Sequence, residues 1–127
     1  MLVDADPETR KLAAFMLQKR GYTVLEARTS ADALQLCESG KVRPDLLLTE
    51  ILLSRMNGPD LAAKLTGSIP ELRVLYMSSG DYARVARPRE IDRERSFLQK
   101  PFTMGTLATK VRRVLDTPLA TVARVNA

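Results

Sequence analysis

The sequence contains no histidine and only one cysteine, Cys37. Histidine is the usual general base near neutral pH, so its absence excludes Ser-His and Cys-His nucleophile pairs. The ligands for a zinc site are missing as well. A single cysteine cannot form an internal disulfide, which fits a reducing compartment, and we expect a cytoplasmic location. Any chemistry must therefore depend on carboxylates, lysine, arginine or hydroxyl groups.

Long hydrophobic runs are also absent, and none approaches the roughly 20 residues that span a bilayer. The first residues lack the basic and apolar regions of a signal peptide. What is present suits one domain with one core: 127 residues, 45% hydrophobic and 28% charged. The net charge of +5 leaves two interpretations open, of which we favour a solvated basic surface over an acidic protein or nucleic acid partner.

The hydrophobic pattern alternates between short strands and helices. The run from Leu46 to Leu48 has no alternation, which is typical of a strand buried on both faces. In the first helix, Leu12, Phe15 and Met16 lie on one face. Strands are expected at residues 2–3, 22–27, 46–51, 72–77 and 97–99. Helices are expected from the cap Asp6 to Gly21, from the cap Ser30 to Glu38, from Gly58 to Gly67, weakly at 82–95, and from the cap Thr103 to Leu115.

Five strands that alternate with five helices imply βαβ units and a parallel sheet covered on both faces. We expect one domain over residues 1–116, followed by a tail or linker at 117–127. In such a sheet, ligands bind beyond the carboxyl ends of the strands. These ends carry acidic groups, hydroxyls and a lysine, which could bind a divalent cation and a phosphoryl group. They are Asp4-Ala5-Asp6, Glu50, Ser78-Ser79 and Lys100-Pro101.

These motifs resemble the response-regulator receiver domain, most of all the receivers at the C-termini of bacterial hybrid sensor histidine kinases. The resemblance covers roughly Leu2 to Leu115 with matching order and spacing. It implies a flavodoxin-like, doubly wound (βα)5 three-layer sandwich with the strand order 2-1-3-4-5. The matching stretches are Leu2-Val3-Asp4-Ala5-Asp6-Pro7-Glu8, residues 21–27, Pro44-Asp45-Leu46-Leu47-Leu48-Thr49-Glu50, Met56-Asn57-Gly58, residues 74–78 and Phe97-Leu98-Gln99-Lys100-Pro101-Phe102.

The resemblance also assigns a role to each site residue. Glu50 occupies the phosphoacceptor position, and Asp4 and Ala5 occupy the acidic pair that helps to bind Mg²⁺, with Asp6 beside them. Ser78 and Phe97 occupy the two switch positions. Lys100 is the lysine that contacts the phosphoryl group, and the family pattern implies a cis bond between Lys100 and Pro101.

Three departures from the family pattern affect the expected chemistry. The acceptor is Glu50 instead of Asp, the second acid is Ala5, and Ser54-Arg55 replaces the usual Pro-Gly of the following loop. Glu carries its carboxylate about 1.5 Å farther out than Asp. A misplacement of about 1 Å can cost on the order of a hundredfold in rate. We therefore expect Glu50 to be a poor phosphoacceptor, and Mg²⁺ binding by Asp4 and Glu50 to be weak or lost.

These departures lead to the hypothesis of a metal-free site in which Glu50 reaches Lys100. Such a contact would mimic part of the contact between a phosphoryl group and the lysine, and would hold the domain in one state without phosphorylation. Asp6 is interpreted as the cap of the first helix more than as a substitute for the missing acid.

Three functions are therefore considered. The favoured one is an atypical, phosphorylation-independent receiver in a bacterial two-component phosphorelay. The alternatives are a conventional Mg²⁺-dependent phosphoacceptor that uses Glu50, and a basic adaptor for acidic protein or nucleic acid. An enzyme with a separate substrate is not expected, because the strand ends offer no nucleophile–base pair.

Partners are expected on the face formed by the fourth helix, the fifth strand and the last helix. The resemblance implies a histidine kinase or another signalling protein there, or a second copy of the chain. Basic residues gather on this face, and a solvated surface explains them equally well. Sequence-specific nucleic acid binding has little support, because no recognition motif or aromatic platform is present. The basic residues are Arg84, Arg87, Arg89, Arg93, Arg95, Lys110, Arg112 and Arg113.

Overall fold

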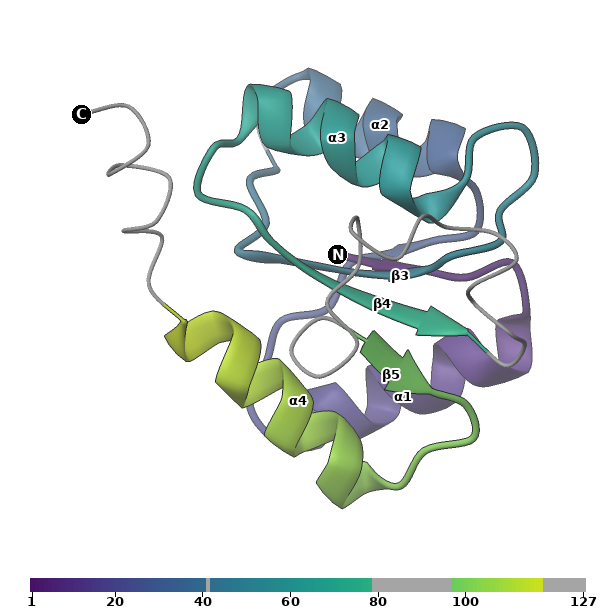
Figure 1. The fold of residues 1–127 in the computed structure, drawn as a ribbon, viewed down its shortest axis with the longest axis vertical. Helices are drawn as coiled ribbons and strands as arrows, with labels where there is room; N and C mark the ends of the chain where they lie inside the picture. Colours follow the sequence, from purple (N-terminus) through teal and green to yellow (C-terminus); the bar gives the residue numbers. More distant parts are fainter. Residues whose placement is uncertain (41, 79–96, 118–127) are drawn as a thin grey trace.

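The computed structural model describes residues 1–40, 42–78 and 97–117. They form a parallel sheet between two pairs of helices, with α2 and α3 on one face and α1 and α4 on the other (Figure 1). The strands are β1 (Leu2–Val3), β2 (Glu26–Ala27), β3 (Leu46–Glu50), β4 (Arg73–Ser78) and β5 (Phe97–Gln99). The helices are α1 (Pro7–Lys19), α2 (Ser30–Glu38), α3 (Gly58–Ser68) and α4 (Met104–Asp116).

The strand order is β2-β1-β3-β4-β5, and every pairing is parallel. This confirms the doubly wound α/β class that the sequence predicts. In such a sheet all carboxyl ends lie along one edge.

The central strand β3 separates two hydrophobic cores. Leu47 packs with the residues under α2 and α3, and Leu48 packs with those under α1 and α4. Both side chains are at most 1% exposed. The continuous apolar run is therefore explained by burial on both faces, as predicted from the lack of alternation.

Helix α1 begins and ends at the predicted signals, but a different face packs. Asp6 caps the helix, and Gly21 follows it with a φ of 91°, a conformation that glycine adopts without strain. The buried residues are Ala13, Ala14 and Leu17. In the face predicted from the sequence, only Met16 is half-buried, and Leu12 and Phe15 are each 53% exposed.

Two other local predictions need correction. The strand expected at residues 22–27 is only Glu26–Ala27, because β1 offers just two residues for it to pair with. Helix α2 is capped by Thr29, whose side chain accepts from the backbone N–H of Asp32. Ser30 has another use, since its hydroxyl donates to the carbonyl of Met56 at 2.7 Å.

Some predictions concern residues outside the described ranges. These are the helix expected at 82–95 with its arginines, Ser79, and the tail beyond residue 117. None of the described helices is long and apolar enough to cross a membrane.

The end of β3 is fixed by a close approach of α3. A Cβ atom at Gly58 would overlap the carbonyl oxygen of Glu50, and the N–H of Gly58 donates to the carbonyl of Ile51 at 2.8 Å. Asn57 caps the helix through the N–H of Asp60. Glycine at position 58 therefore lets α3 begin directly beside the backbone of Glu50.

The opposite, amino-terminal edge of the sheet contains a cavity of about 700 Å³. Its apolar lining includes Leu17, Val24, Leu46 and Val111. The ammonium group of Met1 also lies there and donates to the carbonyl of Leu46 at 3.0 Å.

Candidate functional site

The carboxyl edge of the sheet brings together four of the predicted site residues. Asp4 follows β1, Glu50 ends β3, Ser78 ends β4, and Lys100 follows β5. Asp4, Glu50 and Ser78 are only 2%, 8% and 1% exposed. Polar groups this deeply buried require hydrogen-bond partners.

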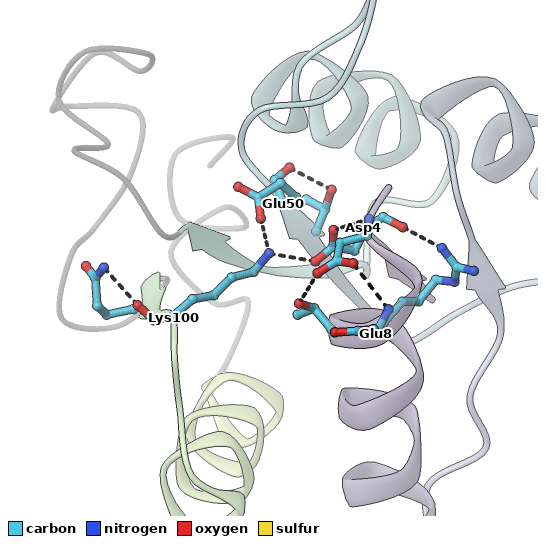
Figure 2. Close-up of polar contacts among 9 residues, drawn as sticks. Asp4, Glu8, Glu50 and Lys100 are labelled. Carbon is cyan, nitrogen blue, oxygen red and sulfur yellow. Dashed lines mark hydrogen bonds and ion pairs between the residues drawn. The ribbon is translucent and has the colours of Figure 1, made fainter.

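The ammonium of Lys100 lies between the carboxylates of Asp4 and Glu50 (Figure 2). Its Nζ atom is 2.7 Å from Oδ2 of Asp4 and also donates to Oε2 of Glu50. The sequence analysis predicts the Glu50–Lys100 contact, and the structure contains it. The bond to Asp4 makes Lys100 a bridge between the ends of β1 and β3.

Backbone hydrogen bonds hold Asp4 in place. The N–H of Asp6 donates to Oδ1 of Asp4 at 2.9 Å, and the N–H of Asp4 donates to the carbonyl of Ala27 at 3.2 Å. One carboxylate oxygen of Asp4 is thus occupied by its own strand end. The other is directed at Lys100.

One cation faces two carboxylates in this site. Burial and these neighbouring charges together shift the pKa values of Lys100 and Glu50. Burial would lower the pKa of Lys100, but hydrogen bonds to Asp4 and Glu50 raise it above 10.5. Burial raises the pKa of Glu50 above 4.5, although Lys100 opposes the shift, and the charge of Asp4 adds to it. Burial, with a smaller contribution from the charge of Asp4, therefore makes Glu50 easier to protonate than an ordinary glutamate.

Ala5 and Asp6 add no acid to the Lys100 bridge. Ala5 is exposed and carries no donor or acceptor in its side chain. The carboxylate of Asp6 accepts from the backbone N–H of Glu8 and, at 2.6 Å, from the hydroxyl of Thr9. The hydrogen bond from Thr9 lowers the pKa of Asp6. These contacts are those of a helix cap.

The two predicted switch positions and the predicted cis-proline lie on β4, on β5 or just after β5. Ser78 comes directly after Met77, which pairs with Glu50. Phe97 is 6% exposed and pairs with Tyr76 within the sheet. The Lys100–Pro101 peptide bond is cis, as the family pattern implies.

The loop after β3 contains a backbone conformation unusual for its residue. Arg55 has a φ of 68°, which favours glycine or asparagine over other residues. It stands where the family pattern has glycine, so a residue with a side chain adopts a conformation that costs it strain. Leu52, two residues beyond Glu50, is 57% exposed.

Arg10 and Glu26 are site residues that the sequence did not predict. The guanidinium of Arg10 donates to the carbonyl of Asp4 at 2.8 Å and to Glu26 at 3.1 Å. The signal was available, since Glu26 begins β2, Asp4 directly follows the neighbouring strand β1, and Arg10 lies one helical turn after the cap Asp6.

The acidic residues of this edge do not fit a magnesium site. Within residues 1–40, 42–78 and 97–117, no group of three or more Asp, Glu or Cys residues is placed to hold a metal ion. Asp4 and Glu50 are the two carboxylates at the site, and one oxygen of each forms an ion pair with Lys100. Mg²⁺ requires near-octahedral oxygen ligands, which this pair does not supply while Lys100 stays in place.

Comparisons with known proteins agree with the fold. Residues 1–112 match the family model of the response regulator receiver domain. The sensor kinase CckA of Brucella abortus is 31% identical over 116 residues, which is 91% of this chain and 12% of the kinase. The receiver protein CpdR of the same organism is 28% identical over 117 residues and is covered over 94% of its length.

Solved structures give the same result. The receiver domain of the hybrid histidine kinase CckA superposes with a TM-score of 0.73 at 30% identity, covering 91% of this chain and 96% of that one. The receiver domain of NtrX from Brucella abortus gives 0.79 at 26% identity, covering 92% and 98%. The chain belongs to the response regulator receiver domain family of two-component signalling.

Proposed function

We propose that this receiver domain is an atypical signalling module that works without Mg²⁺ and without phosphorylation. The observation that carries the proposal is the Lys100 ammonium, which contacts both Asp4 and Glu50. A cation already lies between the two carboxylates, so a second cation would have to displace it or share its ligands. The longer side chain of Glu50 makes this contact possible from the acceptor position.

The electrostatics support the same proposal. Mg²⁺ binding depends strongly on the number of anionic ligands, and Ala5 removes one at the position where the family has an acid. Phosphoryl transfer to Glu50 would also require its carboxylate to leave Lys100 and to align with a donor. The domain would therefore present one fixed surface.

The partner that we propose is a histidine kinase or another signalling protein, as for the family. The basic side chains described on α4, Lys110, Arg112 and Arg113, are compatible with an acidic docking surface. We propose no catalytic activity on a separate substrate, and a location in the cytoplasm.

The test is an amide NMR titration with Mg²⁺, alone and with beryllofluoride as a phosphoryl analogue. The amides of Asp4, Glu50, Ser78 and Lys100 are expected to stay unshifted at millimolar Mg²⁺. The variant A5D/E50D restores the acid pair and the shorter acceptor, and the same amides are expected to shift saturably.

The single variants A5D and E50D are the matched controls, since each restores one half of the site. Saturable shifts in the unsubstituted protein would establish a conventional Mg²⁺-dependent receiver and overturn the proposal. Silence in the double variant would show that Ala5 and Glu50 are not what prevents binding.

A further inference from the structure

The side chain of Arg10 connects Asp4, which follows β1, to Glu26, the first residue of β2. Its Nη1 atom donates to the carbonyl of Asp4 at 2.8 Å, and its Nε atom donates to Oε1 of Glu26 at 3.1 Å. The side chains of Arg10 and Glu26 are 12% and 26% exposed. This pair is therefore far better shielded from solvent than an ordinary surface ion pair.

The contact with Asp4 is made to the backbone, and that places Arg10 outside the charge pairing of the site itself. The carbonyl of Asp4 follows the last residue of β1, where the sheet ladder ends. A carbonyl in this buried position needs a donor, and a guanidinium supplies a charge-assisted one. Arg10 thus fixes the peptide group that carries the Asp4 side chain.

The remaining hydrogen bonds of Asp4 leave one direction for its carboxylate. The Asp4 N–H is bonded to Ala27, and Oδ1 is bonded to the N–H of Asp6. With the carbonyl also fixed by Arg10, Oδ2 is held toward Lys100. Of the two backbone hydrogen bonds of Asp4 described here, only the one at its carbonyl comes from a side chain. Removing Arg10 would break that bond.

We propose that Arg10 is a positioning residue, which uses Glu26 as its anchor to hold Asp4 against Lys100. The inference rests on the proposed function, in which Lys100 bridges Asp4 and Glu50. Arginine is required because its planar fork presents Nε and Nη1 at a fixed separation, so both contacts form at once. A lysine carries all its donors on one nitrogen atom, so it cannot present two separate donor atoms at that fixed separation.

The chain offers a matched control in Lys11. This lysine also pairs with Glu26, at 3.3 Å, but its side chain is 68% exposed, and among the described contacts its ammonium bonds to Glu26 and not to Asp4. Substituting Lys11 removes a positive charge from the same glutamate and leaves the Asp4 carbonyl bonded. Any difference between Arg10 and Lys11 variants therefore reports the backbone contact.

The experiment observes the ammonium group of Lys100 by ¹⁵N NMR at low temperature, with its signal assigned by loss in K100Q. A protonated lysine bonded to two buried carboxylates is expected to give a slowly exchanging signal. In R10Q and E26Q this signal is expected to broaden or disappear, with amide shifts at Asp4 and Lys100 several-fold larger than in K11Q. R10K is expected to behave like R10Q, because retaining the charge does not restore both contacts.

The outcomes separate this inference from the proposed function. A missing Lys100 signal in the unsubstituted protein would overturn the bridge itself. An unchanged signal in R10Q and E26Q, beside a normal one in the unsubstituted protein, would overturn only the role of Arg10, even if both variants were less stable. Should R10Q fail to fold, the comparison of R10K and E26Q with K11Q decides the question.

Discussion

The two edges of the sheet bury charge in opposite ways. At the carboxyl edge, Lys100 lies between Asp4 and Glu50, and each of these three buried groups has a partner of opposite charge. At the amino edge, the ammonium of Met1 donates to the neutral carbonyl of Leu46 beside a cavity lined by both apolar and charged residues. Burial acts on both edges, but only the first compensates it with ion pairs.

The two edges also differ in how many residues their polar contacts require. The carboxyl edge uses residues from strand ends that are about a hundred positions apart, as a buried ion pair between Lys100 and Asp4 requires. Its geometry depends on all three groups at once. At the amino edge, one terminal ammonium bonds to a backbone carbonyl, which residue 46 supplies whatever its side chain. Substitutions should therefore have larger effects at the carboxyl edge.

Removing the shared cation should cause the largest loss of stability. K100M leaves Asp4 and Glu50 without a cation, and their side chains are only 3% and 11% exposed. The free energy of unfolding at neutral pH is expected to fall by about 3 kcal/mol, as for other buried charges that lose a partner. Urea unfolding measures the loss, which should shrink in acid because protonated carboxyl groups need no counter-ion.

The control for this prediction is K11M, which removes a lysine whose side chain is 68% exposed. An exposed pair contributes less than about 1 kcal/mol, so K11M should change stability little. Equal losses in the two variants would mean that the carboxyl edge is no better shielded than the surface.

Replacing Glu50 by glutamine should change the free energy of unfolding less than K100M does, and in the opposite direction. Burial raises the pKa of Glu50, so the folded chain binds more protons than the unfolded chain above pH 4.5. The stability that Glu50 contributes is full below that pH and is lost as the pH rises through the raised folded pKa. At neutral pH, E50Q is therefore expected to equal the unsubstituted protein or exceed it by up to about 1 kcal/mol.

The measurement is the free energy of unfolding of E50Q and the unsubstituted protein from acid to neutral pH. The control is E71Q, because a backbone hydrogen bond lowers the pKa of the exposed Glu71 and reverses the expected sign. A clear loss of stability in E50Q at neutral pH would show that the Glu50–Lys100 bond outweighs the burial of Glu50.

The sequence predicted the carboxyl edge better than the details around it. Strand ends place Asp4, Glu50, Ser78 and Lys100 correctly, because parallel strands bring their carboxyl ends to one edge whatever the loops do. The contact between Glu50 and Lys100 followed from the length of the glutamate.

Side-chain choices between close alternatives were harder to predict. Thr29 and Ser30 are both good caps, and only the position of the Met56 carbonyl decides between them. The packed face of α1 consists of two alanines and a leucine, so hydrophobicity alone pointed to Leu12 and Phe15 instead. Such details depend on neighbours that are distant in sequence and are absent from a local pattern.

The smallest expected effect lies at the amino edge. Burial lowers the pKa of the Met1 ammonium below 8.0, although Cys37 and Asp45 oppose the shift. Between the lowered value and pH 8.0, the unfolded chain binds more protons than the folded chain. The stability of this 127-residue chain is therefore expected to be full above about pH 8.0 and to decline as the pH falls through the lowered value.

The composition of the chain makes this dependence of stability on pH measurable. With no histidine in the sequence, no side chain has an ordinary pKa in the same range, and burial raises the pKa of the Cys37 thiol above 9.0. Urea unfolding in the E50Q background removes the opposing contribution of Glu50, and N-terminal acetylation removes the titrating group. The dependence of stability on pH in this range should persist in E50Q and vanish in acetylated E50Q. A slope that survives acetylation would assign it to another group, and the contrast between the two edges would then rest on the carboxyl edge alone.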